Sequence, residues 1–324
     1  MIDSVMFWNE PNNQSHWDFH MDPDWQQFSR MVRLAGTAVA TANPALRRVM
    51  GGISPIDSAF IEKLREHGAL DAVDVVAVHG FPVDWNYWHA PDSPADDPAT
   101  VPTGIHAWPR KIRLIEQAAG KPVWATEVGV SSFGGEETQA WGLRETAHHL
   151  RDVERAYWYS LFDLPLWREA TTRHKEAEGS AYYRHYHMGL LDATGRPKLA
   201  FHEWPTVAGR MGLCQWYHFE DEATLRESIR WFHELGVQDV RTGISWADSH
   251  RPGAWEWFDQ IVASLAPFRV LATLCFTPPS RGRRPDHTSP PLDPHEFAWF
   301  CGEVARRYGP ATVLPAQADL GLSI

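Results

Sequence analysis

Short strand-like runs alternate with helix-like segments along most of this chain, and this alternation constrains the fold more than any other feature. The run from Val73 to Val78 is almost entirely apolar, as expected for a strand buried on both faces. Eight such strands are predicted, over residues 5–8, 49–54, 73–78, 122–129, 156–161, 213–216, 237–246 and 269–277. Each strand is followed by a helix, or by a segment where a helix would fit, and one of these helices is predicted over residues 136–155.

This order predicts right-handed strand–helix–strand units and a parallel sheet. Eight units in about 310 residues predict an α/β fold that closes into a (β/α)8 TIM barrel. An open doubly wound sheet is the structural alternative, but no Gly-x-Gly-x-x-Gly motif follows any predicted strand. We therefore expect one catalytic barrel over residues 1–309 and a C-terminal tail over residues 310–324.

Composition and charge narrow the classes of partner. The 324 residues are 44% hydrophobic and 22% charged, which is ordinary for a globular protein, and the net charge of −11 argues against nucleic acid or an anionic membrane. Neither a signal peptide nor a membrane span is visible, so a cytoplasmic protein is expected. Cys214, Cys275 and Cys301 form no Cys-x-x-Cys pair and are predicted to be reduced core residues. The oligomeric state is unknown from the sequence.

Carboxylates stand at the ends of two predicted strands, where a barrel enzyme places its chemistry. Glu10 follows the first strand, and Glu127 lies near the end of the fourth. Two carboxyl groups that flank one bond suit glycoside hydrolysis, in which one is protonated and the other is ionised. Arg241 lies in another strand and would keep a neighbouring carboxylate ionised. The structural alternative for Glu10 is a polar turn after a strand.

Two motifs resemble those of the retaining glycoside hydrolases of clan A, which are (β/α)8 barrels. They are Trp8-Asn9-Glu10-Pro11 and Trp124-Ala125-Thr126-Glu127-Val128-Gly129. The resemblance implies that Glu10 is the acid/base and Glu127 the nucleophile of a double displacement at an O-glycosidic bond, without a cofactor. It also implies four carbohydrate-binding residues, which are Asn9 at the sugar 2-hydroxyl, His79, Trp158 as an aromatic floor, and Arg241. The loops resemble beta-xylosidase-type enzymes more than cellulases.

The strand order departs from that clan, whose Asn-Glu-Pro motif lies on the fourth strand. Residues 1–204 would supply the usual strands four to eight, and residues 213–308 the usual strands one to three. Such a circular permutation is easily accommodated, because the two ends of a closed barrel are neighbours. It predicts that residues 5–8 pair with residues 271–276 within one chain, whereas a swapped dimer would pair them between chains. A truncated or frame-shifted member of a longer array is the alternative.

Other residues leave alternatives open. Trp85 and Trp88, in a long loop over residues 83–103, are predicted either to stack on sugar rings or to pack over the rim, and Trp246 is expected to line the cleft. His16 and His20 have a spacing that would suit a metal-dependent hydrolase, but no His-Glu-x-x-His motif is present, so no metal is predicted. The alternative function is a catalytically inactive carbohydrate-binding barrel. The preferred sugar, the linkage and exo or endo action are not specified.

Overall fold

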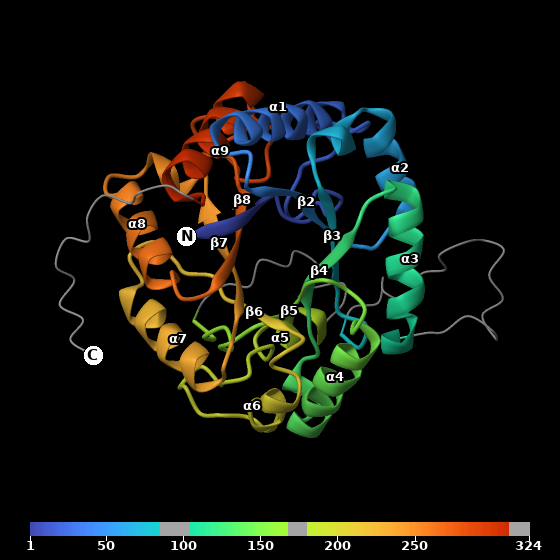
Figure 1. Cartoon of the computed structure of the whole chain (residues 1–324), viewed down its shortest axis with the longest axis vertical. Helices are drawn as coiled ribbons and strands as arrows, with labels where there is room; N and C mark the ends of the chain where they lie inside the picture. The colour runs from blue at the N-terminus through green and yellow to red at the C-terminus, as the bar shows by residue number, and fades with distance from the viewer. Residues whose placement is uncertain (85–103, 168–179, 311–324) are drawn as a thin grey trace.

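The computed structural model describes residues 1–84, 104–167 and 180–310, so Trp85 and Trp88 lie outside the described residues. In that part of the chain, eight parallel strands close into a barrel and follow one another in chain order (Figure 1). The strands are β1 Ile2–Phe7, β2 Arg47–Ile53, β3 Val75–Gly80, β4 Val123–Val128, β5 Ala156–Tyr159, β6 Gly212–Cys214, β7 Asp239–Ser245 and β8 Arg269–Cys275. The predicted (β/α)8 fold is confirmed.

Helices surround the barrel and connect its strands (Figure 1). The described α-helices are α1 Gln26–Ala42, α2 Ser58–Glu66, α3 Trp108–Ala119, α4 Glu136–His149, α5 Ser180–His185, α6 Leu199–Glu203, α7 Glu222–Glu234, α8 Ala254–Ser264 and α9 Pro294–Tyr308. The short 3-10 helices are η1 Ala69–Ala72, η3 Gly104–Ala107, η4 Ser132–Gly134, η5 Trp204–Thr206 and η6 Asp248–His250. None of these helices is long and apolar enough to cross a membrane.

The first and last strands close the barrel within one chain. β1 pairs in parallel with β8, with Val5 opposite Ala272 and Phe7 opposite Leu274. On its other side β1 pairs with β2. The predicted pairing of the N-terminal strand with residues 271–276 is therefore confirmed, and the ends of the described chain meet at one seam of the barrel.

Helices α1 and α9 lie side by side across that seam (Figure 1). α1 buries Phe28, Met31, Val32 and Ala35, which have the spacing of one helical face. Its first turn is capped by Asp22, whose carboxylate accepts hydrogen bonds from the backbone N–H groups of residues 27 and 28. A single apolar face and a carboxylate cap thus position the helix that follows the Asn-Glu-Pro turn.

One helix boundary differs from the sequence-based prediction. The helix expected to run from residue 136 to residue 155 ends at His149, and Leu150 caps it by donating its N–H to the carbonyl of Thr146. The following residues form turns, and Arg155 pairs with Asp3 beside the start of β1. Helical propensity alone does not detect this end, because neither Gly nor Pro occurs over residues 150–155.

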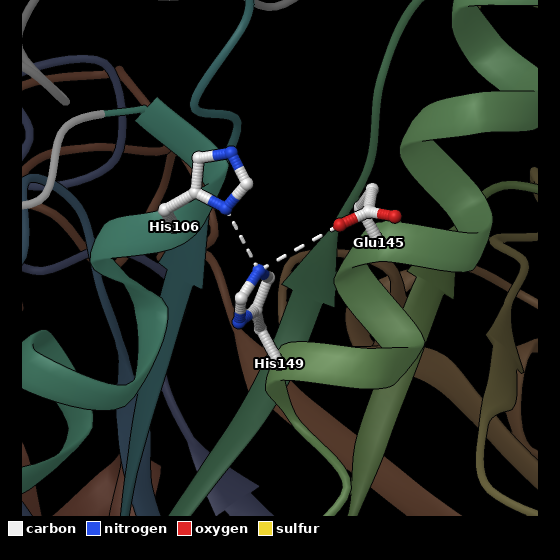
Figure 2. Close-up of side chains that lie close together, drawn as sticks. All are labelled: His106, Glu145 and His149. Atoms are coloured by element: carbon white, nitrogen blue, oxygen red, sulfur yellow. Dashed lines mark hydrogen bonds and ion pairs between the residues drawn. The ribbon is translucent and has the colours of Figure 1, made fainter.

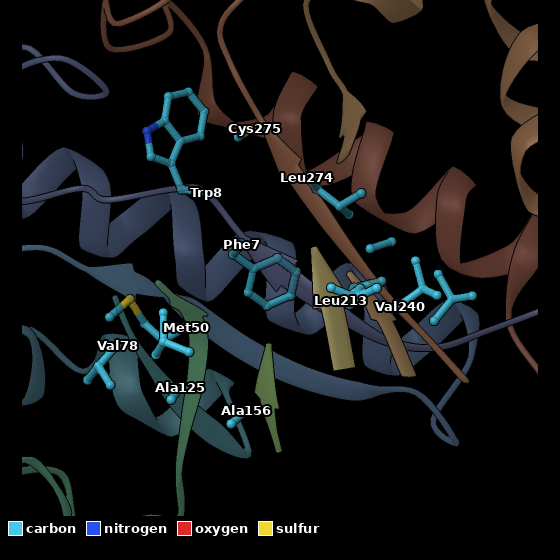
Figure 3. Packing of buried hydrophobic residues seen from close by; sticks show 14 of the residues in the cluster. Phe7, Trp8, Met50, Val78, Ala125, Ala156, Leu213, Val240, Leu274 and Cys275 are labelled. Carbon is cyan, nitrogen blue, oxygen red and sulfur yellow. The ribbon is translucent and has the colours of Figure 1, made fainter. Parts of the chain in front are cut away.

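The buried apolar residues form an inner layer and an outer layer. The inner cluster draws residues from seven strands and fills the barrel: Met6, Val49, Val75, Ala77, Trp124, Tyr157, Cys214 and Leu271. The outer cluster lies between strands and helices and includes Phe7, Met50, Val78, Leu213 and Leu274 (Figure 3). Successive side chains alternate between these two layers, because a strand has a period of two residues.

Candidate active site

The Asn-Glu-Pro segment leaves β1 through a left-handed turn. Trp8 and Glu10 have backbone φ values of 72° and 42°, which residues other than glycine rarely adopt. The Trp8 side chain is fully buried and packs edge-on against Trp17, while its indole N–H donates to the carbonyl of His16. This packing supports the strained turn, which is a common feature of functional sites. Glu10 is therefore not extended, although the following proline favoured that conformation.

Glu10 is held at the carboxyl end of the barrel by three polar neighbours. Its Oε1 atom lies 2.9 Å from Nδ1 of His79, and its Oε2 atom accepts a 2.9 Å hydrogen bond from Asn13. Nδ1 of His16 lies 3.4 Å from Oε2. Burial, followed by the negative charge of Glu127, raises the pKa of Glu10 to about 8. The carboxyl group is consequently protonated at neutral pH.

Glu127 lies opposite His79 in the pairing of β3 with β4. One of its oxygens forms an ion pair with Arg241, and the other lies 3.6 Å from Nδ1 of His79. Carboxylate oxygens of Glu10 and Glu127 approach within 4.8 Å of each other. Two carboxyl groups, one from the turn after β1 and one from β4, thus face one another, and only Glu127 forms an ion pair with the arginine.

Arg241 is a fully buried cation in β7. Besides the ion pair with Glu127, its guanidinium donates to Oδ1 of Asn9 at 2.7 Å and to Oγ1 of Thr273 at 3.1 Å. It also lies 3.2 Å from Sγ of Cys214. A planar guanidinium offers donors in fixed directions, so Arg241 fixes the relative positions of Asn9 and Glu127.

His79 connects the two carboxyl groups and has a definable hydrogen-bonding state. Its Nε2 atom lies 2.9 Å from the hydroxyl of Thr126, and that hydroxyl donates to the sulfur of Met6. The hydroxyl therefore accepts from His79, which assigns the ring proton to Nε2 and leaves Nδ1 as an acceptor for the proton of Glu10. Burial lowers the pKa of His79 well below its usual range, consistent with this neutral form.

A glycine in β2 makes room for this imidazole. A Cβ atom at Gly52 would lie 2.0 Å from Nε2 of His79, far inside contact distance. Gly52 also accepts the backbone hydrogen bond of Glu10 through its carbonyl. The residue therefore positions both members of the His79–Glu10 pair.

A cleft of about 1090 Å³ opens over this group of residues. Asn9, Glu10 and Glu127 line it. Aromatic side chains line it as well, among them His16, Phe81, Tyr159, Trp216 and Phe276. The hydroxyl of Tyr159 lies 3.0 Å from Nε2 of His185, and its ring packs edge-on against Phe81. Apolar walls with a few convergent polar groups are typical of ligand sites.

Two of the tryptophans expected in the cleft do not line it. Trp158 packs in the outer layer, between the strands and the helices, whereas its neighbours Tyr157 and Tyr159 face the barrel interior. Trp246 is 1% exposed and packs against Phe297. Both predictions were based on the position of the tryptophan at a strand end. They did not consider which of the two faces of the strand the side chain lies on.

Several aromatic residues that line the cleft are not among the predicted site residues, and three of them lie at or near the ends of predicted strands. Tyr159 directly follows Trp158, Trp216 ends the predicted strand 213–216, and Phe276 lies in the predicted strand 269–277. Phe276 has a φ of 71°, so the backbone after β8 turns in the same unusual way as that after β1. Applying the strand-end rule to every strand would have identified Trp216 and Phe276.

His16 and His20, whose spacing offered an alternative metal site, do not form a metal-ligating group. His16 contacts Glu10, and His20 is exposed. Within the described residues, neither belongs to a set of three side chains close enough to hold a metal. Glu10, His79 and Glu127 are close enough, but the guanidinium of Arg241 already lies against Glu127 and would repel a divalent cation.

The chain matches no known family model and no curated protein sequence. Similar solved structures include the endoglucanase Cel5A of Pseudomonas stutzeri, with 12% identity over 71% of each chain and a TM-score of 0.35. The endo-beta-1,4-mannanase of Thermotoga petrophila shares 10% identity over 94% of this chain and 76% of its own, with a TM-score of 0.36. The OMP decarboxylase of Leishmania donovani shares 10% identity over 94% and 93%, with a TM-score of 0.38. Activity is therefore inferred from the site alone.

Proposed function

We propose that this chain is a retaining glycoside hydrolase. The observation that carries the proposal is the approach of Glu10 and Glu127 to within 4.8 Å across the cleft. Retaining enzymes hold their two carboxyl groups about 5–5.5 Å apart, whereas inverting enzymes separate them by about 6.5–9.5 Å to admit a water molecule. An approach of the two carboxyl groups to within 4.8 Å is closer than the inverting separation, which supports the retaining arrangement.

The two carboxyl groups have environments that suit different roles. Glu10 has a pKa raised to about 8 and is protonated, so it donates a proton to the glycosidic oxygen. Glu127 is paired with Arg241, and its free oxygen attacks the anomeric carbon as the bond to the leaving group breaks. Glu10, now ionised, then takes a proton from water, whose oxygen attacks the anomeric carbon and releases Glu127.

The remaining buried polar residues position the sugar. Because Oδ1 of Asn9 accepts a hydrogen bond from Arg241, the Nδ2 amide group of Asn9 is the donor that it offers to a sugar hydroxyl. The hydrogen bond between Nδ1 of His79 and Oε1 of Glu10 holds the protonated carboxyl group in place. Aromatic side chains stack on sugar rings, and Tyr159 and Trp216, which line the cleft, take the roles that were expected for Trp158 and Trp246.

The circular permutation belongs to the same proposal. If β1 corresponds to the Asn-Glu-Pro strand of clan A, then β4 carries the nucleophile three strands further round the barrel, as in that clan. The pairing of β1 with β8 supports an intramolecular permutation, because strands from the two ends of the described chain complete one barrel.

A panel of aryl glycosides, with the product anomer followed by NMR, tests the proposal. We expect one glycoside to be hydrolysed with retention at the anomeric carbon. The Glu127→Ala variant should lose this activity and, with added azide, should form a glycosyl azide of inverted configuration. Glu137→Ala, at an exposed position on α4, serves as the matched control and should act like the unmodified protein.

Two results would contradict the proposal. Inversion at the anomeric carbon would exclude a glycosyl-enzyme intermediate on Glu127. Equal, background-level release by the unmodified protein and Glu127→Ala over the whole panel would favour the carbohydrate-binding barrel without turnover.

A further inference from the structure

A second group of potential ligands lies outside the cleft. His106 comes from η3, and Glu145 and His149 come from α4 (Figure 2). Nδ1 of His106 lies 3.0 Å from Nε2 of His149, which lies 3.7 Å from a carboxylate oxygen of Glu145. One donor atom from each residue lies within 4.8 Å of the others. None of the three lines the catalytic cleft.

The fold brings these side chains together from two directions. Glu145 and His149 are four residues apart in α4, so they lie on the same face of the helix. His106 precedes α3, and η3 packs against α4. Figure 2 shows the two imidazoles and the carboxylate converging on one region of space. The cluster therefore joins two elements that are distant in the sequence.

The distances match those around a small metal ion. Zinc binds histidine nitrogen and carboxylate oxygen at about 2.0–2.2 Å in a tetrahedral arrangement, which places ligand atoms about 3.3 Å apart. The separations of 3.0 Å and 3.7 Å lie on either side of this value. Without a metal, the facing nitrogens of His106 and His149 share one hydrogen bond, and a metal would replace the proton between them.

We propose that His106, Glu145 and His149 bind a first-row divalent cation such as Zn²⁺. Two imidazoles and one carboxylate supply three positions, and water takes the fourth. The ion links η3 to the last turn of α4 and stabilises the packing of these elements. This site is independent of Glu10 and Glu127, so it stands whether or not the chain is a glycosidase.

His148 offers a matched control in the same turn. It is exposed and adjacent to His149, but it does not belong to the group, and Arg151 lies 3.4 Å from its ring nitrogen and bonds to its carbonyl at 3.2 Å. Replacing it removes one surface imidazole without removing a proposed ligand.

Zn²⁺ binding to the untagged full chain, measured by titration calorimetry, tests the site. Loss of a residue that merely orients a metal ligand costs about 10–100-fold in affinity, so His106→Ala and His149→Ala should each cost at least roughly tenfold. His148→Ala and Glu10→Gln should bind as the unmodified chain does. Zn²⁺ should also raise the Tm of the unmodified chain but not that of His149→Ala. If an alanine variant does not fold, Glu145→Gln is measured in its place, because it removes the carboxylate ligand and keeps the size of the side chain.

Three results would overturn the proposal. The first is the absence of saturable Zn²⁺ binding. The second is a Zn²⁺ affinity within about twofold of the unmodified chain in both His106→Ala and His149→Ala. The third is a loss of Zn²⁺ affinity in His148→Ala that equals the loss in these two variants. The last result would assign binding to general surface histidines.

Discussion

Nδ1 of His79 lies 2.9 Å from Oε1 of Glu10, and both side chains are buried at the carboxyl end of the barrel. The same nitrogen lies 3.6 Å from Glu127, so one neutral imidazole contacts both carboxyl groups. Because Thr126 fixes the ring proton on Nε2, the proton between His79 and Glu10 belongs to the carboxyl group. This relationship makes the protonation of Glu10 the first property to test.

The rate of hydrolysis should fall at alkaline pH. Glu10 must be protonated to assist departure, and its pKa is raised to about 8, so kcat/KM should fall as the pH rises above that value. Glu10→Gln should lose about 10²–10⁴-fold with poor leaving groups and should lose the alkaline limb. Measuring kcat/KM against pH with two leaving groups checks this, and an alkaline limb unchanged in Glu10→Gln would contradict the assignment.

Removal of Arg241 should destabilise the protein strongly. Arg241→Met leaves Glu127 buried without its cation, and breaking such a pair costs about 3–5 kcal/mol. Urea denaturation should show this loss in the free energy of unfolding. Arg230→Met removes an exposed partner of Glu227, where the loss should be about 0–1 kcal/mol. Equal effects of the two substitutions would show that burial of the Arg241 pair has no energetic consequence.

Substitution of Gly52 should affect catalysis through His79. The added methyl group of Gly52→Ala would lie 2.0 Å from Nε2, so the imidazole must leave its present position beside Glu10. Displacement of a reacting group by about 1 Å can cost roughly 10²-fold in rate, and kcat should fall accordingly. Gly209→Ala, where an added Cβ meets nothing within 4 Å, is the control. A crystal structure of the Gly52→Ala variant with His79 unmoved would refute the explanation.

Two tryptophans should respond differently to truncation. Trp216→Ala removes a wall of the cleft and should raise KM for the preferred glycoside. Trp158→Ala creates a cavity in the outer layer, so it should lower the free energy of unfolding by about 3–5 kcal/mol and leave KM unchanged. Kinetics and denaturation of both variants check the assignment. A raised KM in Trp158→Ala, without loss of stability, would return the aromatic floor to Trp158.

Much of the fold could be predicted because strands and helices have different periods of burial. The strand over residues 73–78 was recognised from its apolar run, and the observed strand Val75–Gly80 overlaps it. The end of α4 at His149 was not, because neither Gly nor Pro marks it in residues 150–155. Local patterns describe burial along one element, and they do not report partners from distant elements.

The sequence by itself determined the alternation of strands and helices and the carboxylates at two strand ends. Only the tertiary structure decided that Glu10 leaves β1 through a left-handed turn, that Tyr159 rather than Trp158 faces the cleft, and that His106 meets His149. Hydrophobic periodicity depends on residues that are close together in the sequence, so it can be recognised in a short segment of the chain. Side-chain direction at a strand end and contacts between distant helices depend on how the whole chain packs, and no local pattern specifies them.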